Sequence, residues 1–249
     1  MRKSWQRLVA GMLASMLAIA WWGSSGASQS LSDRSLQHHP AQITQFPLRS
    51  HPLPSHLAAI ASSNSAGDYF DKIQTTKVGY LIWSQFPVSI YVAASATETS
   101  DRPWQQAVRA AIADWQAYFP LTLAERAENA DIRIWNRRPP LELDEQGRLV
   151  RARAGQVQYE LDLKSTADPP ILSHRCDIFL NPHQAPSYLR ATIRHELGHA
   201  LGIWGHSPIE TDTMYFSQVQ KPAPISQRDL NTLRRIYQQP TRLGWPAQS

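Results

Sequence analysis

Apolar and polar positions alternate in several short runs along the middle of the chain. Residues 88–92 and 131–135 show the alternation most clearly, and it is the pattern of a strand with one buried face. Residues 157–163 and 176–180 are two further strand-like runs, and the second is closed by an Asn-Pro pair. The pattern predicts a folded domain that begins near Gly79 and contains a β-sheet.

Apolar residues at helical spacing predict three helices in the same part of the chain. The first is capped by Ser100 or Asp101 and ends before Pro120. The second opens near Pro186, and the third begins after a cap at Ser226. The buried side of the second helix consists of four aliphatic residues: Leu189, Ile193, Leu197 and Leu201. This helix can therefore hold the polar residues of its other side on a rigid support.

The first 27 residues have the pattern of an export signal. A basic start is followed by an apolar run over residues 8–22 and by small residues that allow cleavage after Ala27. The run of about fifteen residues is shorter than the roughly twenty that span a bilayer. An uncleaved anchor is the alternative, since Trp21 and Trp22 suit a membrane interface. We therefore expect an exported protein, extracellular or in the periplasm or cell envelope, with membrane contact only if the segment is not cleaved.

Residues 28–76 show no sustained apolar period and are rich in Ser, Pro, His and Gln. Such a stretch is typical of a linker or a loosely ordered pro-segment. The predicted domain then covers residues 77–240, and residues 241–249 are a tail without an anchor signal. We expect one folded domain, since 249 residues can bury an ordinary core.

Charge and cysteine content exclude two classes of protein. Three of the five net positive charges lie in the first 27 residues, which contain no acidic residue, so the remainder is close to neutral. This is not the charge of a nucleic-acid-binding protein. Cys176 is the single cysteine, so the domain has no internal disulfide and must be held together by packing, to which a metal could add. We expect Cys176 to pack as a small apolar residue.

The second predicted helix carries the sequence His-Glu-Leu-Gly-His at residues 195–199. A step of four residues along a helix brings His195 and His199 to one face, one turn apart, where both can reach a single ion. Glu196 lies beside the first histidine, close enough to accept a proton from a metal-activated water. A catalytic zinc takes three protein ligands, so one ligand is still missing. Gly202 can end the helix in a left-handed conformation, after which the chain can turn back and offer His206.

Two other interpretations of this motif remain open. A bare His-Glu-x-x-His can also be a helix with two surface histidines and no metal, but Gly202, His206 and Met214 follow it in order and favour a metal site. In another zinc-peptidase architecture Glu210, and not His206, would supply the third ligand.

The chain resembles a secreted bacterial member of the metzincin zinc endopeptidases, in the matrixin-like branch (peptidase M10). The family pattern is His-Glu-x-x-His-x-x-Gly-x-x-His followed by a methionine turn, and residues 195–202 match it in register. The spacing from His206 to Met214 also matches the matrixins. Residues 114–132 and 226–230 are similar to further parts of the family, and the resemblance covers roughly residues 80–238.

The resemblance implies an α+β fold of the metzincin type. A twisted mixed sheet would pack on two long helices, with the active-site helix, the methionine turn and a C-terminal helix below an edge strand. His195, His199 and His206 would bind one catalytic zinc ion, and Met214 would form the floor under the three imidazoles. The resemblance leaves structural calcium unassigned.

It also implies a zinc-dependent endopeptidase that hydrolyses peptide bonds in proteins, with a metal-activated water and Glu196 as general base. The expected partner is a protein or peptide substrate extended along the edge strand, with no nucleic acid, and the protein is expected to be a monomer. The alternative is a non-catalytic secreted binding module of the same fold that contains zinc, against which the intact Glu196 speaks.

The chain departs from the family pattern before the third histidine. Three residues, Ile203, Trp204 and Gly205, separate Gly202 from His206, where the family has two. We expect Gly205 to accommodate the extra residue through a positive φ. The cysteine that covers zinc in matrixin pro-segments has no counterpart before the domain, and Cys176 is not given that role.

Overall fold

The computed structural model describes residues 43–60, 64–93, 102–144, 146–148, 153–164 and 168–248. The predicted export signal or anchor at residues 1–27 lies outside these ranges. No helix within them is both long enough and apolar enough to cross a membrane.

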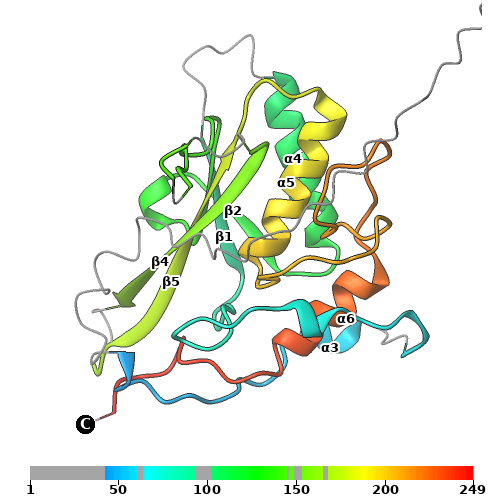
Figure 1. Cartoon of the computed structure of the whole chain (residues 1–249). Helices are drawn as coiled ribbons and strands as arrows, with labels where there is room; N and C mark the ends of the chain where they lie inside the picture. Colours follow the sequence, from blue (N-terminus) through cyan, green and yellow to red (C-terminus); the bar gives the residue numbers. More distant parts are fainter. Residues whose placement is uncertain are drawn as a thin grey trace, which may run out of the picture.

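In this part of the chain, five strands form one mixed sheet with the order β2-β1-β3-β5-β4 (Figure 1). The strands are β1 (Val88–Val92), β2 (Leu121–Ala124), β3 (Ile132–Trp135), β4 (Gly155–Lys164) and β5 (Ile171–Leu180). Neighbours are parallel except for β4, which pairs antiparallel with β5 and forms one edge. The predicted strands at 88–92 and 131–135 are thus confirmed, and the two other strand-like runs lie inside β4 and β5.

Alternation along the strands places one face of the sheet in the core, because successive side chains of a strand point to opposite faces. Ile90 pairs with Ile132 across β1 and β3, and both are fully buried. Their neighbours Tyr91 and Arg133 are only partly buried, on the other face. Cys176 of β5 is buried next to Ile132, as expected for a small apolar residue.

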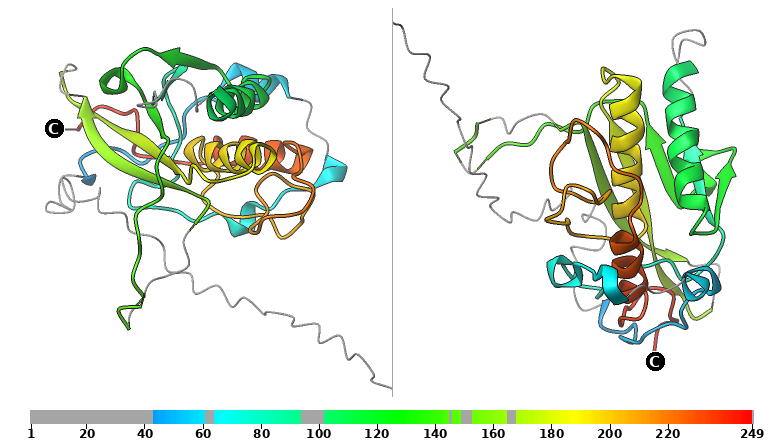
Figure 2. Two further views of the ribbon diagram at one scale, coloured as in Figure 1. Left: turned by 90° about the horizontal axis from the view of Figure 1, so that it is seen from above. Right: turned by 90° about the vertical axis from the view of Figure 1, so that its right-hand side faces the viewer.

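Two helices of equal length, α4 (Arg102–Gln116) and α5 (Pro186–Ala200), lie side by side on the sheet (Figure 2). Trp115 of α4 is fully buried, and its indole N–H donates to the carbonyl of Arg194 in α5 at 2.8 Å. α5 also contacts β4 and β5. The predicted α+β fold, a mixed sheet packed on two long helices, is therefore confirmed, and it places α5 beside the edge of the sheet.

The last helix, α6 (Gln227–Ile236), begins at the predicted cap. The Ser226 hydroxyl accepts from the backbone N–H of Asp229, and the Asp229 carboxylate accepts from the backbone N–H of Ser226. This reciprocal pair satisfies two backbone donors that a helix start otherwise leaves free.

Residues 43–60 and 64–76, in the stretch predicted as a linker or pro-segment, pack against the domain. They include a short helix, α3 (Ser55–Ala59), and the 3-10 turns η2 (Asn64–Ala66) and η3 (Phe70–Lys72). Phe46, Leu57 and Tyr69 are 0–1% exposed and belong to the core. The sequence did not indicate this packing, because these buried residues are isolated in the sequence and form no periodic pattern.

Residues 241–248, near the end of the chain, pack against the region before the sheet. Arg49 and Thr241 exchange two backbone hydrogen bonds of 3.1 and 2.9 Å, and the rings of His51 and Trp245 stack at 4.1 Å. Thr241 is fully buried. The region before the sheet and the end of the chain therefore hold each other in place.

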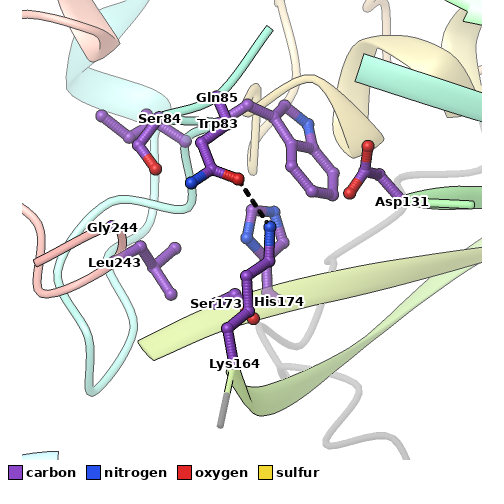
Figure 3. A pocket seen from close by; sticks show the side chains of 10 residues that line it. Trp83, Ser84, Gln85, Asp131, Lys164, Ser173, His174, Leu243 and Gly244 are labelled. Carbon is purple, nitrogen blue, oxygen red and sulfur yellow. Dashed lines mark hydrogen bonds between the residues drawn. The ribbon is translucent and has the colours of Figure 1, made fainter. Parts of the chain in front are cut away.

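A small pocket lies at the start of β5, and none of its lining residues belongs to the histidine motif (Figure 3). Its free volume is about 20 Å³, the space of about one water molecule. His174 lies in its wall, 6% exposed and stacked on Trp83 at 3.9 Å. Burial lowers the pKa of His174 to about 3, so this imidazole is neutral at ordinary pH.

Candidate metal centre

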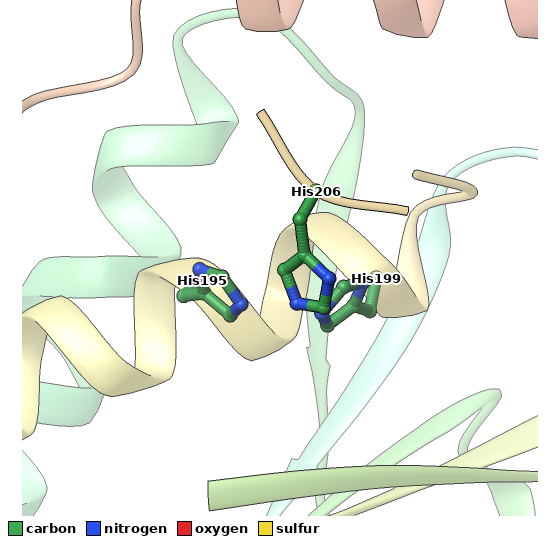
Figure 4. Close-up of side chains that lie close together, drawn as sticks. All are labelled: His195, His199 and His206. Atoms are coloured by element: carbon green, nitrogen blue, oxygen red, sulfur yellow. The ribbon is translucent and has the colours of Figure 1, made fainter. Parts of the chain in front are cut away.

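The structure brings together the three histidines that the sequence singled out (Figure 4). His195 and His199 project from one face of α5, and His206 reaches them from the loop that follows. One ligand atom from each ring can be chosen so that all three lie within 4.8 Å of one another. Glu210, the alternative third ligand, is exposed and does not belong to this cluster.

Backbone carbonyls orient the two helical imidazoles. Nδ1 of His195 lies 2.9 Å from the carbonyl oxygen of Thr213, and Nδ1 of His199 lies 2.6 Å from that of Ile203. A carbonyl oxygen only accepts, so each Nδ1 carries the proton and donates. The lone pair is then on Nε2, which is the state that a metal ligand needs.

The charge state of the triad also suits a cation. Burial lowers the pKa of His195 and of His199 below the usual 6.5, and the pKa of His206 is lowered to about 4, again chiefly by burial. All three rings are therefore neutral at pH 7. Metal binding does not have to displace a proton from them.

The end of α5 directs the chain back toward the metal centre. The N–H of Ile203 donates to the carbonyl of Gly198 at 3.0 Å, and that of Gly202 donates to the carbonyl of His199 at 2.9 Å. This pair of bonds is a Schellman motif, which needs a residue with positive φ after the helix. Gly202, with φ of +128°, supplies it, as the sequence predicted.

The extra residue before His206 is accommodated by packing. Gly205 does not have a positive φ, so the expected mechanism is wrong. A Cβ at this position would instead overlap the backbone carbonyl of Lys72. Gly205 therefore allows the backbone just before His206 to contact the backbone at Lys72. Trp204 packs between Tyr159 of β4, at 5.3 Å between ring centroids, and His199, at 6.1 Å.

Met214 lies in a tight turn below α5. Its carbonyl accepts from the N–H of Ser207 at 2.8 Å, and its side chain is fully buried. A Cβ at Gly198 would overlap the Met214 sulfur. The thioether therefore packs directly on the helix backbone between the two helical histidines, which agrees with the packing role expected for it.

Glu196 is buried beside the triad, with 7% of its surface exposed. A Cβ at Gly155, the first residue of β4, would lie 2.8 Å from its carboxylate. The start of the edge strand therefore runs directly over this group. Burial raises the pKa of Glu196 to about 8, with Arg153 acting in the opposite direction. A divalent cation on the triad would also favour the ionised form.

Sequence reasoning missed the residues that support this arrangement. Gly155 was a lone glycine at the start of a strand-like run, a recognised sign of close backbone approach. The predicted cap at Ser226 indicated the start of a helix but no role in the site for Asp229. Its carboxylate also accepts the backbone N–H groups of Thr213 at 2.9 Å and of Met214 at 3.4 Å. No local pattern indicates that second role.

The donor set fits zinc. Imidazole nitrogens bind zinc at about 2.0 to 2.1 Å, so three tetrahedral ligands would lie roughly 3.3 Å apart. In this structure one ligand atom of each ring lies within 4.8 Å of the other two. Three neutral imidazoles with one open direction are the ligand set of a catalytic zinc, whereas calcium and magnesium prefer oxygen ligands.

The family model of the matrixins (peptidase M10) matches residues 82–238, which include the sheet, both long helices, the histidine triad and α6. No curated protein matches the chain. Membership of this peptidase family implies zinc and supports a metallopeptidase. The chain belongs to the matrixin family.

Proposed function

We propose that this protein is a zinc-dependent endopeptidase that hydrolyses peptide bonds in proteins. The observation that carries the proposal is the convergence of three neutral, oriented imidazoles on one point, with the carboxylate of Glu196 buried beside them. His195, His199 and His206 hold the metal, and Met214 supports the helix beneath them. When bound, zinc polarises the scissile carbonyl and makes a water molecule acidic enough to attack near pH 7.

Glu196 is the general base of the proposed reaction. Its carboxylate takes the proton of the attacking water and then passes it to the leaving amine. Its burial below the start of β4 keeps bulk water away from this transfer. The pKa of about 8 in the absence of metal, lowered by a bound cation, allows the group both to accept and to release a proton near neutral pH.

The substrate is an extended peptide that pairs with β4. This strand forms the edge of the sheet, so one side of its backbone is not used by the sheet. An extended chain can add to such an edge by β-augmentation. Since β4 begins directly above Glu196, a peptide on this edge passes the metal centre.

The test is a comparison of wild type with Glu196→Gln, which keeps the size of the side chain and removes the base. We expect zinc content to stay at the wild-type level and the rate of cleavage of an unfolded protein to fall by about 10²- to 10⁴-fold. Glu210→Gln, an exposed carboxylate of the following loop, is the matched control and should retain activity. Equal rates in wild type and Glu196→Gln would refute the role of Glu196. A wild-type protein that binds zinc but cleaves no protein would favour the alternative, a non-catalytic binding module of the same fold.

A further inference from the structure

The segment of residues 67–74 precedes the sheet and lies against α6 (Figure 1). It also contacts the loop that carries His206, between α5 and α6. Tyr69 is its most buried link. Its hydroxyl donates to the Asp229 carboxylate at 2.6 Å, and its backbone N–H donates to the hydroxyl of Thr232 at 3.1 Å. The pKa of Tyr69 is raised well above its usual value, first by burial and then by Asp229, so the phenol stays protonated and donates.

Tyr69 is connected to the first histidine through a short series of hydrogen bonds. Asp229, fully buried, accepts from the phenol of Tyr69 and from the backbone N–H of Thr213. The carbonyl of Thr213 accepts from Nδ1 of His195. The Asp229 carboxylate thus fixes the backbone at Thr213, and the carbonyl of Thr213 sets the orientation of the His195 ring.

A second contact of the segment holds the residues just before His206. The N–H of Gln74 donates to the carbonyl of Trp204 at 2.9 Å. The carbonyl of Lys72 lies so close to Gly205 that a side chain there would overlap it. His206 lies in no helix or strand, so the position of its ring depends on this backbone.

A third contact reaches the residue just after His206. Arg228 donates to the carbonyl of Asp68 at 3.1 Å and to the carboxylate of Asp212 at 3.0 Å. Asp212 is buried and accepts from the hydroxyl of Ser207. The loop around His206 is therefore tied to segment 67–74 on both sides.

We propose that segment 67–74 is a permanent positioning element of the metal centre, and that Tyr69 is its principal positioning residue. The inference rests on the proposed zinc site and adds to it the groups that hold the site in shape. The segment must remain attached in the active protein, because its loss would remove the Tyr69 phenol from Asp229, the Gln74 N–H from the Trp204 carbonyl and the Lys72 backbone from Gly205.

The experiment is a zinc titration of the full chain with Tyr69→Phe, which removes one hydroxyl and keeps the ring. Competition with a chelator should show about a tenfold or greater loss of zinc affinity, the usual effect of removing a group that orients a metal ligand. The visible spectrum of the Co²⁺-substituted protein should also change, because it reports ligand geometry. Gly205→Ala, which forces the backbone of Lys72 away from residue 205, should weaken zinc binding in the same way. This variant tests the inference if Tyr69→Phe does not fold.

Thr241→Val is the matched control. It also removes a fully buried hydroxyl that joins distant parts of the chain, through a 3.2 Å bond to the carbonyl of Val78, but it does not touch the metal loops. It should lower thermal stability without changing zinc affinity or the Co²⁺ spectrum. Wild-type zinc affinity in both Tyr69→Phe and Gly205→Ala, or an equal loss in Thr241→Val, would overturn the inference. A wild type that binds no zinc would instead refute the proposed function, and the inference with it.

Discussion

His174 illustrates how much a single buried side chain can contribute to the pH dependence of stability. Its pKa lies at about 3 in the fold, against a usual value of 6.5, because burial disfavours the charged ring. As pH falls below about 6.5, the unfolded chain binds a proton there and the folded chain does not. The stabilising contribution is complete above that pH and is lost toward pH 3, by at most about 1.4 kcal/mol per pH unit.

We therefore predict that His174→Phe, which retains a ring against Trp83, makes the fold less sensitive to acid. Urea unfolding at about pH 7, 6 and 5 should show the free energy of unfolding of the variant rising relative to wild type as pH falls. The three histidines of the metal centre titrate in both proteins, so their effect cancels in the difference. Parallel curves over this range would contradict the prediction.

Single residues also show what the sequence can and cannot reveal about the site. His195, Glu196 and His199 could be predicted because one helix sets their relation, and helical spacing is a local property. Gly155 and Tyr69 could not be predicted in the same way. Each acts on a partner far along the chain, at Glu196 and at Asp229, and no periodic pattern records such a contact.

The loop between α5 and α6 is the element on which the third ligand depends. We predict that His206→Ala loses most of its zinc affinity, while Glu210→Ala keeps the wild-type zinc content. The reason is geometric, since the ring of His206 faces the two helical imidazoles and Glu210 is exposed outside that cluster. Zinc analysis after dialysis against a weak chelator measures the difference. Zinc lost only from Glu210→Ala would assign the third ligand to the carboxylate.

Element length decided which parts of the fold could be predicted. α4 and α5 carry several turns of helix-spaced apolar residues, and β1 and β3 alternate clearly. β2 was not predicted, because it has four residues of which only Leu121 is buried. β5 is twice as long as the predicted run, since its first half pairs with β4 through residues that do not follow a simple alternation of apolar and polar types.

At the scale of the whole molecule, the region before the sheet is part of the domain and not an appendage to it. We predict that cleavage of the export signal produces an N-terminus near Ser28 and that the active protein retains residues 43–76. Mass spectrometry of the exported, active protein tests both statements. An active form that begins after residue 76 would contradict the structural role of this region, and an intact Met1 in a membrane fraction would indicate an anchor.

The hydrogen bond between Tyr69 and Asp229 joins residues that are 160 positions apart. Contacts of such high sequence separation form late in folding, because the loop that they close must first lose much of its freedom. A chain emerges with its N-terminal part first, so Tyr69 is made long before Asp229. A partly synthesised chain therefore lacks the carboxylate that holds its methionine turn, and the metal centre is assembled only when nearly the whole chain is present.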